Sequence, residues 1–137
     1  MLKIVFSLLF AVSLFSGAVR AQSAPALQSV QVLAVASTGN PYWDYIPDGG
    51  FATPSSAHSG PALWVATFEN GYSVSRQAKF NGLTMTLDRS EPVPSTGPAY
   101  GWIRYWRVGT NFTSGQFTFS AVSVKTSRNF STFVNVR

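Results

Sequence analysis

The stretch YGWIRYWRV, residues 100–108, is the densest run of aromatic and β-branched residues in the chain. Its period of two is typical of a β-strand whose side chains alternate between two faces. One face would carry Trp102, Arg104 and Trp106, with a guanidinium able to stack on either indole. This face could grip a sugar ring or an anionic group, or it could be a core face with Arg104 reaching out to solvent. The other face offers only Ile103 as a purely aliphatic residue, which favours the core interpretation.

Two Asn-Gly pairs, at residues 70–71 and 81–82, are typical of two-residue hairpin turns. They predict a three-stranded antiparallel meander over residues 63–69, 72–80 and 83–88. The pairs predicted across the second turn are Phe80 with Leu83, Lys79 with Thr84, Ala78 with Met85, Gln77 with Thr86, Arg76 with Leu87, and Ser75 with Asp88.

This register divides the meander into an apolar face and a polar face. The side chains expected on the core face are Leu63, Val65, Thr67, Val74, Ala78, Phe80, Leu83, Met85 and Leu87. Arg76 falls on the same face, and a charged residue there suggests a β-bulge. Trp64 and Phe68 fall on the opposite face, and the register places Ser73, Ser75 and Gln77 beside them.

Aromatic rings among hydroxyls and amides are typical of a carbohydrate-binding surface, because rings stack on sugar C–H groups while polar side chains bind the hydroxyls. We therefore single out Trp64 and Phe68 as a candidate ligand surface. The alternatives are that a loop or the N-terminal segment covers the pair, or that a bulge reverses the faces.

Further strands are expected at residues 27–37, 116–126 and 130–136, which brings the number to about seven, with no convincing helix. Short strands separated by turn residues predict an all-β domain. We expect a single antiparallel two-sheet sandwich of immunoglobulin-like type, with a small β-barrel as the alternative.

Residues 1–21 have the order of a secretory signal peptide: a basic residue, the apolar run 4–15, and small residues up to Ala21. The apolar run is too short for a comfortable membrane span, so no stable membrane anchor is expected. Cleavage after Ala21 would leave residues 22–137 as one β-sandwich domain, secreted to the periplasm or the exterior.

The composition limits the partners. Removing Lys3 and Arg20 from the ten basic residues leaves eight, against five acidic ones, which is too small an excess to indicate nucleic-acid binding. Such a charge still permits attraction to an anionic envelope polymer. The chain has no cysteine, so the domain must rely on its core, to which 15% aromatic residues would contribute.

A short aromatic cluster precedes the long loop-like segment 47–61. The cluster consists of Tyr42, Trp43 and Tyr45. The segment holds His58, the only histidine, which is interpreted as a solvated loop residue. A small hydrolase working here would need His58 near Asp44 or Asp48, but no nucleophile motif accompanies them. No catalytic residue, metal site or cofactor is therefore assigned.

Several segments resemble small secreted bacterial proteins of the YolA-like family, whose function is unknown. They are SGQFTFSA at 114–121, RNFST at 128–132, VQVLAV at 30–35 and the strand around Trp102. The resemblance implies a bacterial secreted β domain and supplies no catalytic residue.

The leading hypothesis is a non-enzymatic secreted module that binds a glycan or another envelope polymer through aromatic and hydroxyl side chains. Its candidate ligand-binding residues are Trp64, Phe68, Tyr42, Trp43, Tyr45, Trp102, Arg104 and Trp106. The alternatives are a module or inhibitor that binds a protein partner, and a small hydrolase using the 42–58 region.

Overall fold

The computed structural model describes residues 24–47 and 53–137, and these form two antiparallel sheets without a helix. The predicted signal peptide and Asp48 lie outside the described residues. One sheet has the order β2 (Asp44–Tyr45), β1 (Ser29–Ser37), β3 (Gly60–Asn70), β7 (Gly101–Phe112) and β6 (Thr86–Val93). The other has the order β5 (Leu83–Thr84), β4 (Ser73–Phe80), β8 (Gly115–Ser123) and β9 (Asn129–Val136).

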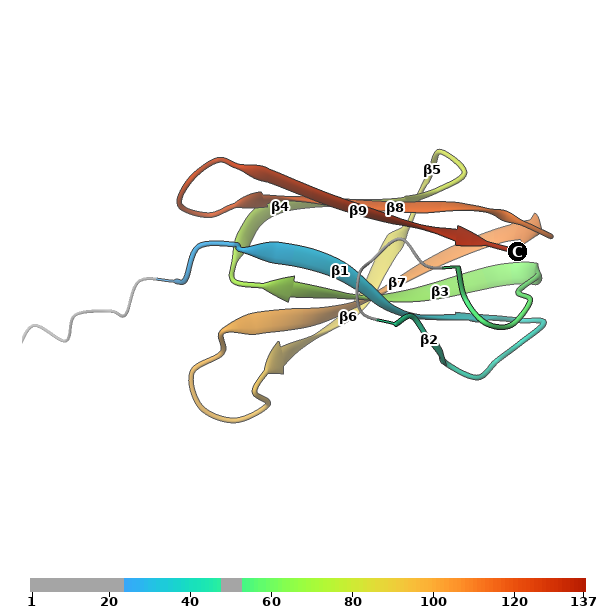
Figure 1. The fold of residues 1–137 in the computed structure, drawn as a ribbon, viewed down its shortest axis with the longest axis horizontal. Coiled ribbons are helices and arrows are strands. Elements are labelled where there is room, and N and C mark those ends of the chain that lie inside the picture. Colours follow the sequence, from blue (N-terminus) through green and yellow to red (C-terminus); the bar gives the residue numbers. More distant parts are fainter. Residues whose placement is uncertain (1–23, 48–52) are drawn as a thin grey trace, which may run out of the picture.

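The two sheets face one another as separate layers (Figure 1). The predicted all-β sandwich is thereby confirmed, and the sheets do not close into the alternative barrel. The immunoglobulin-like assignment stays a prediction. The described part of the chain has nine strands instead of about seven, because residues 44–45 form a strand and the predicted strand 83–88 is divided between the two sheets.

The core lies between the layers and is built from alternate residues of the longer strands. Its fully buried members include Leu63 and Val65 from one sheet, and Phe80, Phe117 and Val134 from the other. Aromatic rings then join the layers: Phe80 meets Phe112 at 5.0 Å, and Trp106 meets Phe119 at 5.6 Å between ring centroids. Each such side chain contributes about 1.5–3 kcal/mol on burial, which supports a domain without disulfides.

The predicted meander is wrong at its first turn, because β3 and β4 belong to different sheets. Gly71 has a φ of 107°, and a Cβ there would collide with the backbone of Ala26 and Leu27. The N-terminal segment thus passes directly against the turn, where Tyr72 N–H donates to the carbonyl of Pro25 at 3.0 Å. The Asn-Gly pair therefore carries the chain from one layer to the other and does not make a hairpin.

At the second turn only the first predicted pairs are confirmed, Phe80 with Leu83 and Lys79 with Thr84. Met85 N–H still donates to the carbonyl of Ala78 at 2.9 Å, after which the chain crosses into the five-stranded sheet as β6 and pairs with β7. The long partner of β4 is β8. The predicted pairs Gln77 with Thr86, Arg76 with Leu87 and Ser75 with Asp88 are therefore wrong. In the structure these β4 residues oppose Ser120, Ala121 and Val122.

The faces predicted for β3 are confirmed, since Leu63, Val65 and Thr67 are fully buried while Trp64 and Phe68 are half-buried on the opposite side. The neighbours are different from those expected. Trp64 lies between Ala36 and Arg107, and Phe68 lies between Gln31 and Ile103. Ser73, Ser75 and Gln77 are in the other sheet.

Three predicted core residues are exposed instead: Val74, Leu83 and Leu87. Each sits where the chain passes between layers, just after Gly71 or around the β5–β6 crossing, so the sheet neighbours that the meander assumed are missing.

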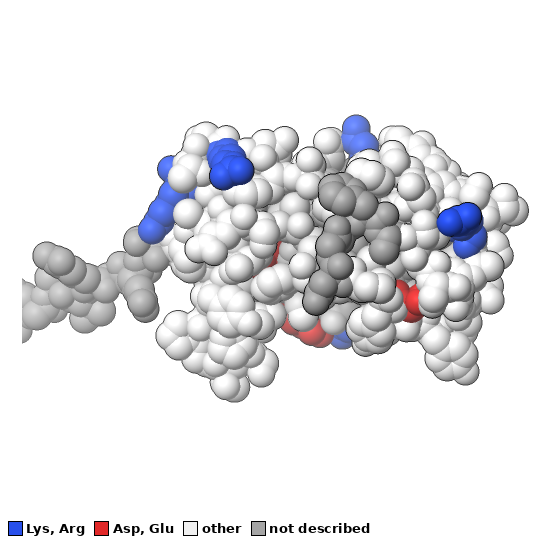
Figure 2. Space-filling view, viewed as in Figure 1, with Lys and Arg blue, Asp and Glu red and all other residues white. Residues whose placement is uncertain are grey.

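The charges are divided between the two sheets. The described acidic residues all lie on strands of the five-stranded sheet: Asp44, Glu69, Asp88 and Glu91. The four-stranded sheet with its final turn and C-terminus carries Arg76, Lys79, Lys125, Arg128 and Arg137, and no acid. Figure 2 shows the visible basic side chains mostly over this upper layer, and the acidic ones over the lower layer. The five-stranded sheet also carries Arg89, Arg104 and Arg107, so it has both signs of charge, whereas the four-stranded sheet has basic residues only.

Candidate binding surface

Aromatic side chains gather on the outer face of the five-stranded sheet. We call this surface the aromatic face and define it by Trp43, Tyr45, Trp64, Phe68 and Tyr105. Its centre is a pocket of about 140 Å³ lined by Leu33, Ala34, Trp43, Tyr45, Ala66, Ile103 and Tyr105. Trp43 is 36% exposed and Tyr45 is 73% exposed, so both rings are within reach of a ligand.

Tyr105 forms one wall of this pocket and is held from three sides. The Trp43 ring lies 5.8 Å from it between centroids, at an interplanar angle of 57°. On another side the Arg89 guanidinium stands 4.1 Å above the ring, and the Tyr105 hydroxyl donates to Glu91 Oε2 at 3.2 Å. Burial and the nearby Glu91 carboxylate raise the pKa of Tyr105 above its usual value, so the phenol stays protonated. The ring is a fixed, neutral wall.

The short strand β2, which contains Tyr45 and directly follows Trp43, is held by a group of polar side chains that we call the His58 cluster: Ser37, Asp44, Ser55, Ser56 and His58. Ser37 and His58 are buried, whereas Ser55 and Ser56 are exposed. Asp44 pairs with Val35 of β1 in the sheet register. The His58 ring joins the two strands, with Nδ1 3.1 Å from Ser37 Oγ and Nε2 3.3 Å from Asp44 Oδ2. The short β2 is therefore fastened by side chains as well as by backbone pairing.

The protonation pattern of His58 follows from the donors around Ser37. Ser37 Oγ accepts the backbone N–H groups of Asn40 at 3.1 Å and Ser59 at 3.3 Å. Its own proton is then free to go to His58 Nδ1, which leaves Nε2–H to donate to Asp44. We assign this tautomer on hydrogen-bonding grounds.

The interpretation of His58 as a solvated loop residue is wrong, because its side chain is 1% exposed. Sequence reasoning failed here because the polar partners of His58 are 21 and 14 residues away along the chain. A flanking run of Ser, Gly and Pro carries no signal for such partners.

Asp44 completes the cluster with hydrogen bonds from Ser55 Oγ and Ser56 N–H, each at 2.8 Å. Burial alone would raise the pKa of this carboxyl, but the hydrogen bonds from Ser56, Ser55 and His58 together hold it below its usual value. Asp44 is therefore ionised at neutral pH.

The order Ser37, His58, Asp44 has the residue types of a hydrolase triad, but its geometry is that of a junction. Ser37 is 0% exposed and its oxygen already accepts two N–H groups, so a substrate carbonyl has no path to it. The cluster holds β2, β1 and the start of β3 together.

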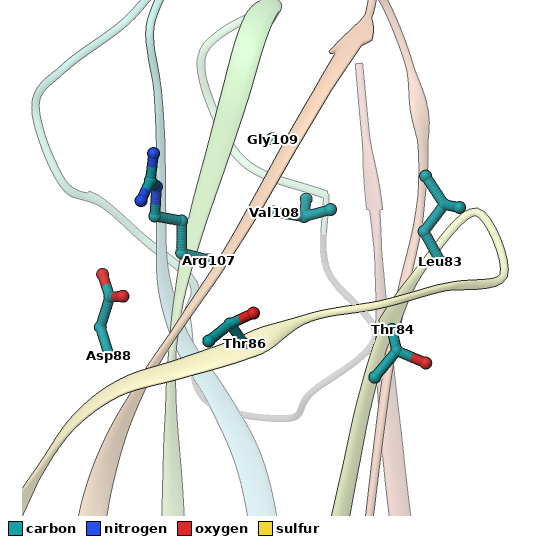
Figure 3. Close-up of a pocket in the computed structure, with 7 residues that line it drawn as sticks. All are labelled: Leu83, Thr84, Thr86, Asp88, Arg107, Val108 and Gly109. Atoms are coloured by element: carbon teal, nitrogen blue, oxygen red, sulfur yellow. The ribbon is translucent and has the colours of Figure 1, made fainter.

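A second hollow of about 460 Å³ lies where β5 and β6 cross between the sheets (Figure 3). Arg107 and Asp88 lie on one side of it, and Thr86, which pairs with Arg107 across β6 and β7, lies beside them (Figure 3). Because Arg107 pairs with Trp64 across β3 and β7, this polar hollow borders the aromatic face. A ligand that extends past Trp64 would meet both charges and a hydroxyl.

Trp102, Arg104 and Trp106 point to the interior. Trp106 and Arg104 are 5% and 6% exposed, and Trp102 packs edge-on against Tyr72 at 6.0 Å. Trp106 Nε1 donates to Thr67 Oγ1 at 2.9 Å. The core interpretation describes this face, but the expectation that Arg104 exits to solvent is wrong.

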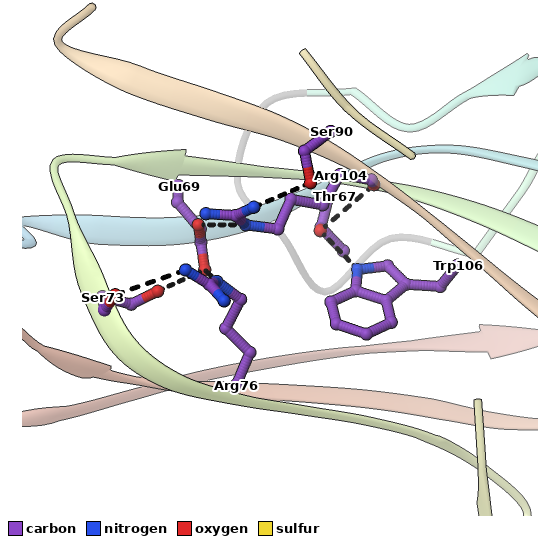
Figure 4. Close-up of polar contacts among 7 residues, drawn as sticks. All are labelled: Thr67, Glu69, Ser73, Arg76, Ser90, Arg104 and Trp106. Atoms are coloured by element: carbon purple, nitrogen blue, oxygen red, sulfur yellow. Dashed lines mark hydrogen bonds and ion pairs between the residues drawn. The ribbon is translucent and has the colours of Figure 1, made fainter. Parts of the chain in front are cut away.

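Arg104 stays inside because a buried carboxylate meets it. We call this group the Glu69 cluster: Glu69, Ser73, Arg76, Ser90 and Arg104 (Figure 4). Arg104 Nε donates to Glu69 Oε2 at 2.6 Å, and its Nη1 donates to Ser90 Oγ at 2.7 Å. Burial lowers the pKa of Arg104 and Glu69 opposes that change.

Arg76 approaches the same carboxylate from the other sheet (Figure 4). Its Nε lies 3.1 Å from Glu69 Oε1, as an ion pair that is not aligned for a hydrogen bond. Glu69 thus accounts for the arginine on the predicted core face of β4. A bulge is also present there, between Ser73 and Ser75.

Within residues 24–47 and 53–137, no three His, Cys, Asp or Glu side chains are close enough to share a metal ion. The same residues contain no helix of the length and apolarity needed to cross a membrane.

A family model described as a domain of unknown function (DUF4879) matches residues 21–136. The chain belongs to this DUF4879 family. No curated protein matches the sequence. The DUF4879 model spans all nine strands, so both sheets and both outer faces lie within the family domain. The resemblance to YolA-like proteins stays a prediction.

The aromatic face combines predicted and unpredicted residues. Trp43, Tyr45, Trp64 and Phe68 are among the candidates that the sequence suggested, and Tyr42 is 80% exposed beside them without lining the pocket. Tyr105 was not among the predicted residues, because it lies on the face of its strand opposite to Trp102 and Trp106, and its contacts with Trp43 and Arg89 come from distant parts of the chain.

Proposed function

We propose that the protein is a secreted, non-enzymatic module that binds a glycan of the cell envelope or its surroundings through the aromatic face. The observation that carries the proposal is the pocket between Trp43, Tyr45 and Tyr105, an aromatic-walled hollow on the outer face of the five-stranded sheet. Aromatic walls suit the C–H faces of a sugar ring, and binding sites are commonly apolar hollows with a few polar groups at the rim.

The polar groups at the rim suit the same ligand. Glu91 and Arg89 stand beside Tyr105, and Arg107, Asp88 and Thr86 border the neighbouring hollow. Side chains of these types donate to and accept from sugar hydroxyls. A chain of several sugar units could therefore lie across Trp64 from one hollow to the other.

The test is co-sedimentation of residues 22–137 with insoluble chitin, cellulose and peptidoglycan sacculi. We expect binding to at least one of them, and Trp43→Ala should weaken it about tenfold because one central aromatic supplies a large share of such affinity. Tyr42→Ala is the matched control, since Tyr42 is exposed nearby and does not line the pocket.

A twofold or smaller change in the control would support the pocket. Equal losses for the two variants would contradict it, and so would the absence of binding to all three polymers.

A further inference from the structure

The outer face of the four-stranded sheet is covered by hydroxyl and amide side chains. Cross-strand pairing arranges them in rows, one of which runs from Gln77 through Ser120 to Ser131. The next row runs from Lys79 through Thr118 to Phe133. We call this surface the hydroxyl-amide face.

The middle of this face is hollowed. A pocket of about 300 Å³ is lined by Gln77, Lys79, Gln116, Thr118, Phe119, Ser120, Ser131, Thr132 and Phe133. Phe133 is half-buried and supplies apolar ring surface, while Lys79 supplies a positive charge. The pocket thus combines a ring, a cation and several neutral hydrogen-bonding groups.

The charge around the pocket has a single sign. No strand of the four-stranded sheet contains Asp or Glu, whereas Lys79, Lys125, Arg128 and Arg137 lie on the sheet or its final turn and end. Arg76 of the same sheet is turned inward to Glu69. All the described acids are on the other sheet. The opposite layer has both signs, because Arg89 and Arg107 lie there with the acids. A polymer that carries negative charges therefore meets no described carboxylate side chain on the four-stranded sheet.

We propose that the hydroxyl-amide face is a second binding site, which takes an acidic polysaccharide with carboxylate-bearing sugars. A carboxylate would pair with Lys79, a sugar ring would cover Phe133, and hydroxyls would bond to Gln77, Ser120 and Ser131. A phosphodiester chain without sugar hydroxyls could pair with Lys79, but it would not form hydrogen bonds with Gln77, Ser120 and Ser131. This site stands independently of the aromatic face.

The probe is polygalacturonate, a polymer of uronic acid, applied to immobilised residues 22–137 at low ionic strength. We expect Lys79→Gln to weaken binding about fivefold, because it removes the one charge inside the pocket. Lys125→Gln is the matched control: it makes the same charge change on the final turn of the sheet, outside the pocket. Trp43→Ala should leave this binding unchanged.

Several results would overturn the proposal. Equal losses of affinity in the two lysine variants would mean that the polymer is attracted only by the net positive charge of the protein. Equal affinity for single-stranded polythymidylate would mean that any polyanion suffices, and no binding of polygalacturonate by the unaltered protein would remove the site. Loss of polygalacturonate binding in Trp43→Ala alone would transfer the ligand to the aromatic face. Binding that depends on Lys79 but not on Trp43 would support the second site, whether or not the aromatic face binds chitin, cellulose or sacculi.

Discussion

The Glu69 cluster and the His58 cluster are both built around buried polar side chains, Glu69 in one and His58 in the other, yet they differ in what they join. The Glu69 cluster lies between the sheets, where a carboxylate from β3 meets Arg104 of its own sheet and Arg76 of the other. The side chains of the His58 cluster fasten β2 to β1 within one layer, and the backbone N–H of His58 also donates to the carbonyl of Arg137, which follows β9 of the other layer. The comparison suggests that the first holds the sandwich together, whereas the second positions the aromatic face.

The largest expected effect comes from breaking the Glu69 cluster. Glu69→Gln should lower the free energy of unfolding by about 3–5 kcal/mol, because it leaves two arginines inside without their counter-charge. Urea unfolding at neutral pH measures this. Glu91→Gln is the control, since Glu91 is partly exposed and its ion pair with Arg89 is on the surface, so a change below about 1 kcal/mol is expected. Similar losses in the two variants would contradict a structural role for Glu69.

A smaller and more local effect is expected from His58→Ala. The change leaves Ser37 and Asp44 without their shared partner, and about 1–3 kcal/mol should be lost. Hydrogen exchange should accelerate at Asn40, Ser56 and Ser59, while amides of β7 and β8 stay protected. Affinity for the glycan should also fall, because Trp43 and Tyr45 would no longer be held in place when β2 loses its attachment to β1. Uniform acceleration across both sheets would show that this cluster also holds the sandwich together.

The smallest expected effect is a pH dependence of the free energy of unfolding that is due to Asp44. Its pKa in the folded protein lies below the ordinary value of 3.8, so the ionised form stabilises the fold. That contribution is complete above pH values near 3.8 and is lost as the pH falls through the lower folded-state pKa. The difference in unfolding free energy between the unaltered protein and Asp44→Asn should therefore shrink on acidification. A constant difference down to pH 2 would contradict the assignment.

The sandwich could be predicted because its evidence is local. Alternation along residues 63–69 and 100–108 places apolar side chains on one face of each strand, and this held for Leu63, Val65 and Trp106. The partners of the strands were less predictable. An Asn-Gly pair signals a reversal of the chain, but it does not say whether the next strand joins the same sheet, and at Gly71 it does not.

The candidate surface shows the same division. The outward positions of Trp64 and Phe68 follow from alternation along the strand, whereas the wall formed by Tyr105 depends on β2 lying near β7 across two other strands. A polar side chain is buried only where partners bind it. The sequence shows no such partners next to His58 or Arg104, so both side chains were predicted to reach solvent. Those partners, Asp44 and Ser37 for one and Glu69 for the other, come from distant parts of the chain.

The sequence by itself determined an all-β domain with alternating strands, an aromatic contribution to a core without disulfides, and the outward faces of Trp64 and Phe68. Only the tertiary structure decided which strands share a sheet, which polar groups are buried, and that all the described acids lie on one layer. The physical reason is that alternation of side chains is a property of neighbouring residues in one strand and can be read from the sequence. Ion pairs and sheet pairing form between residues that only folding brings together.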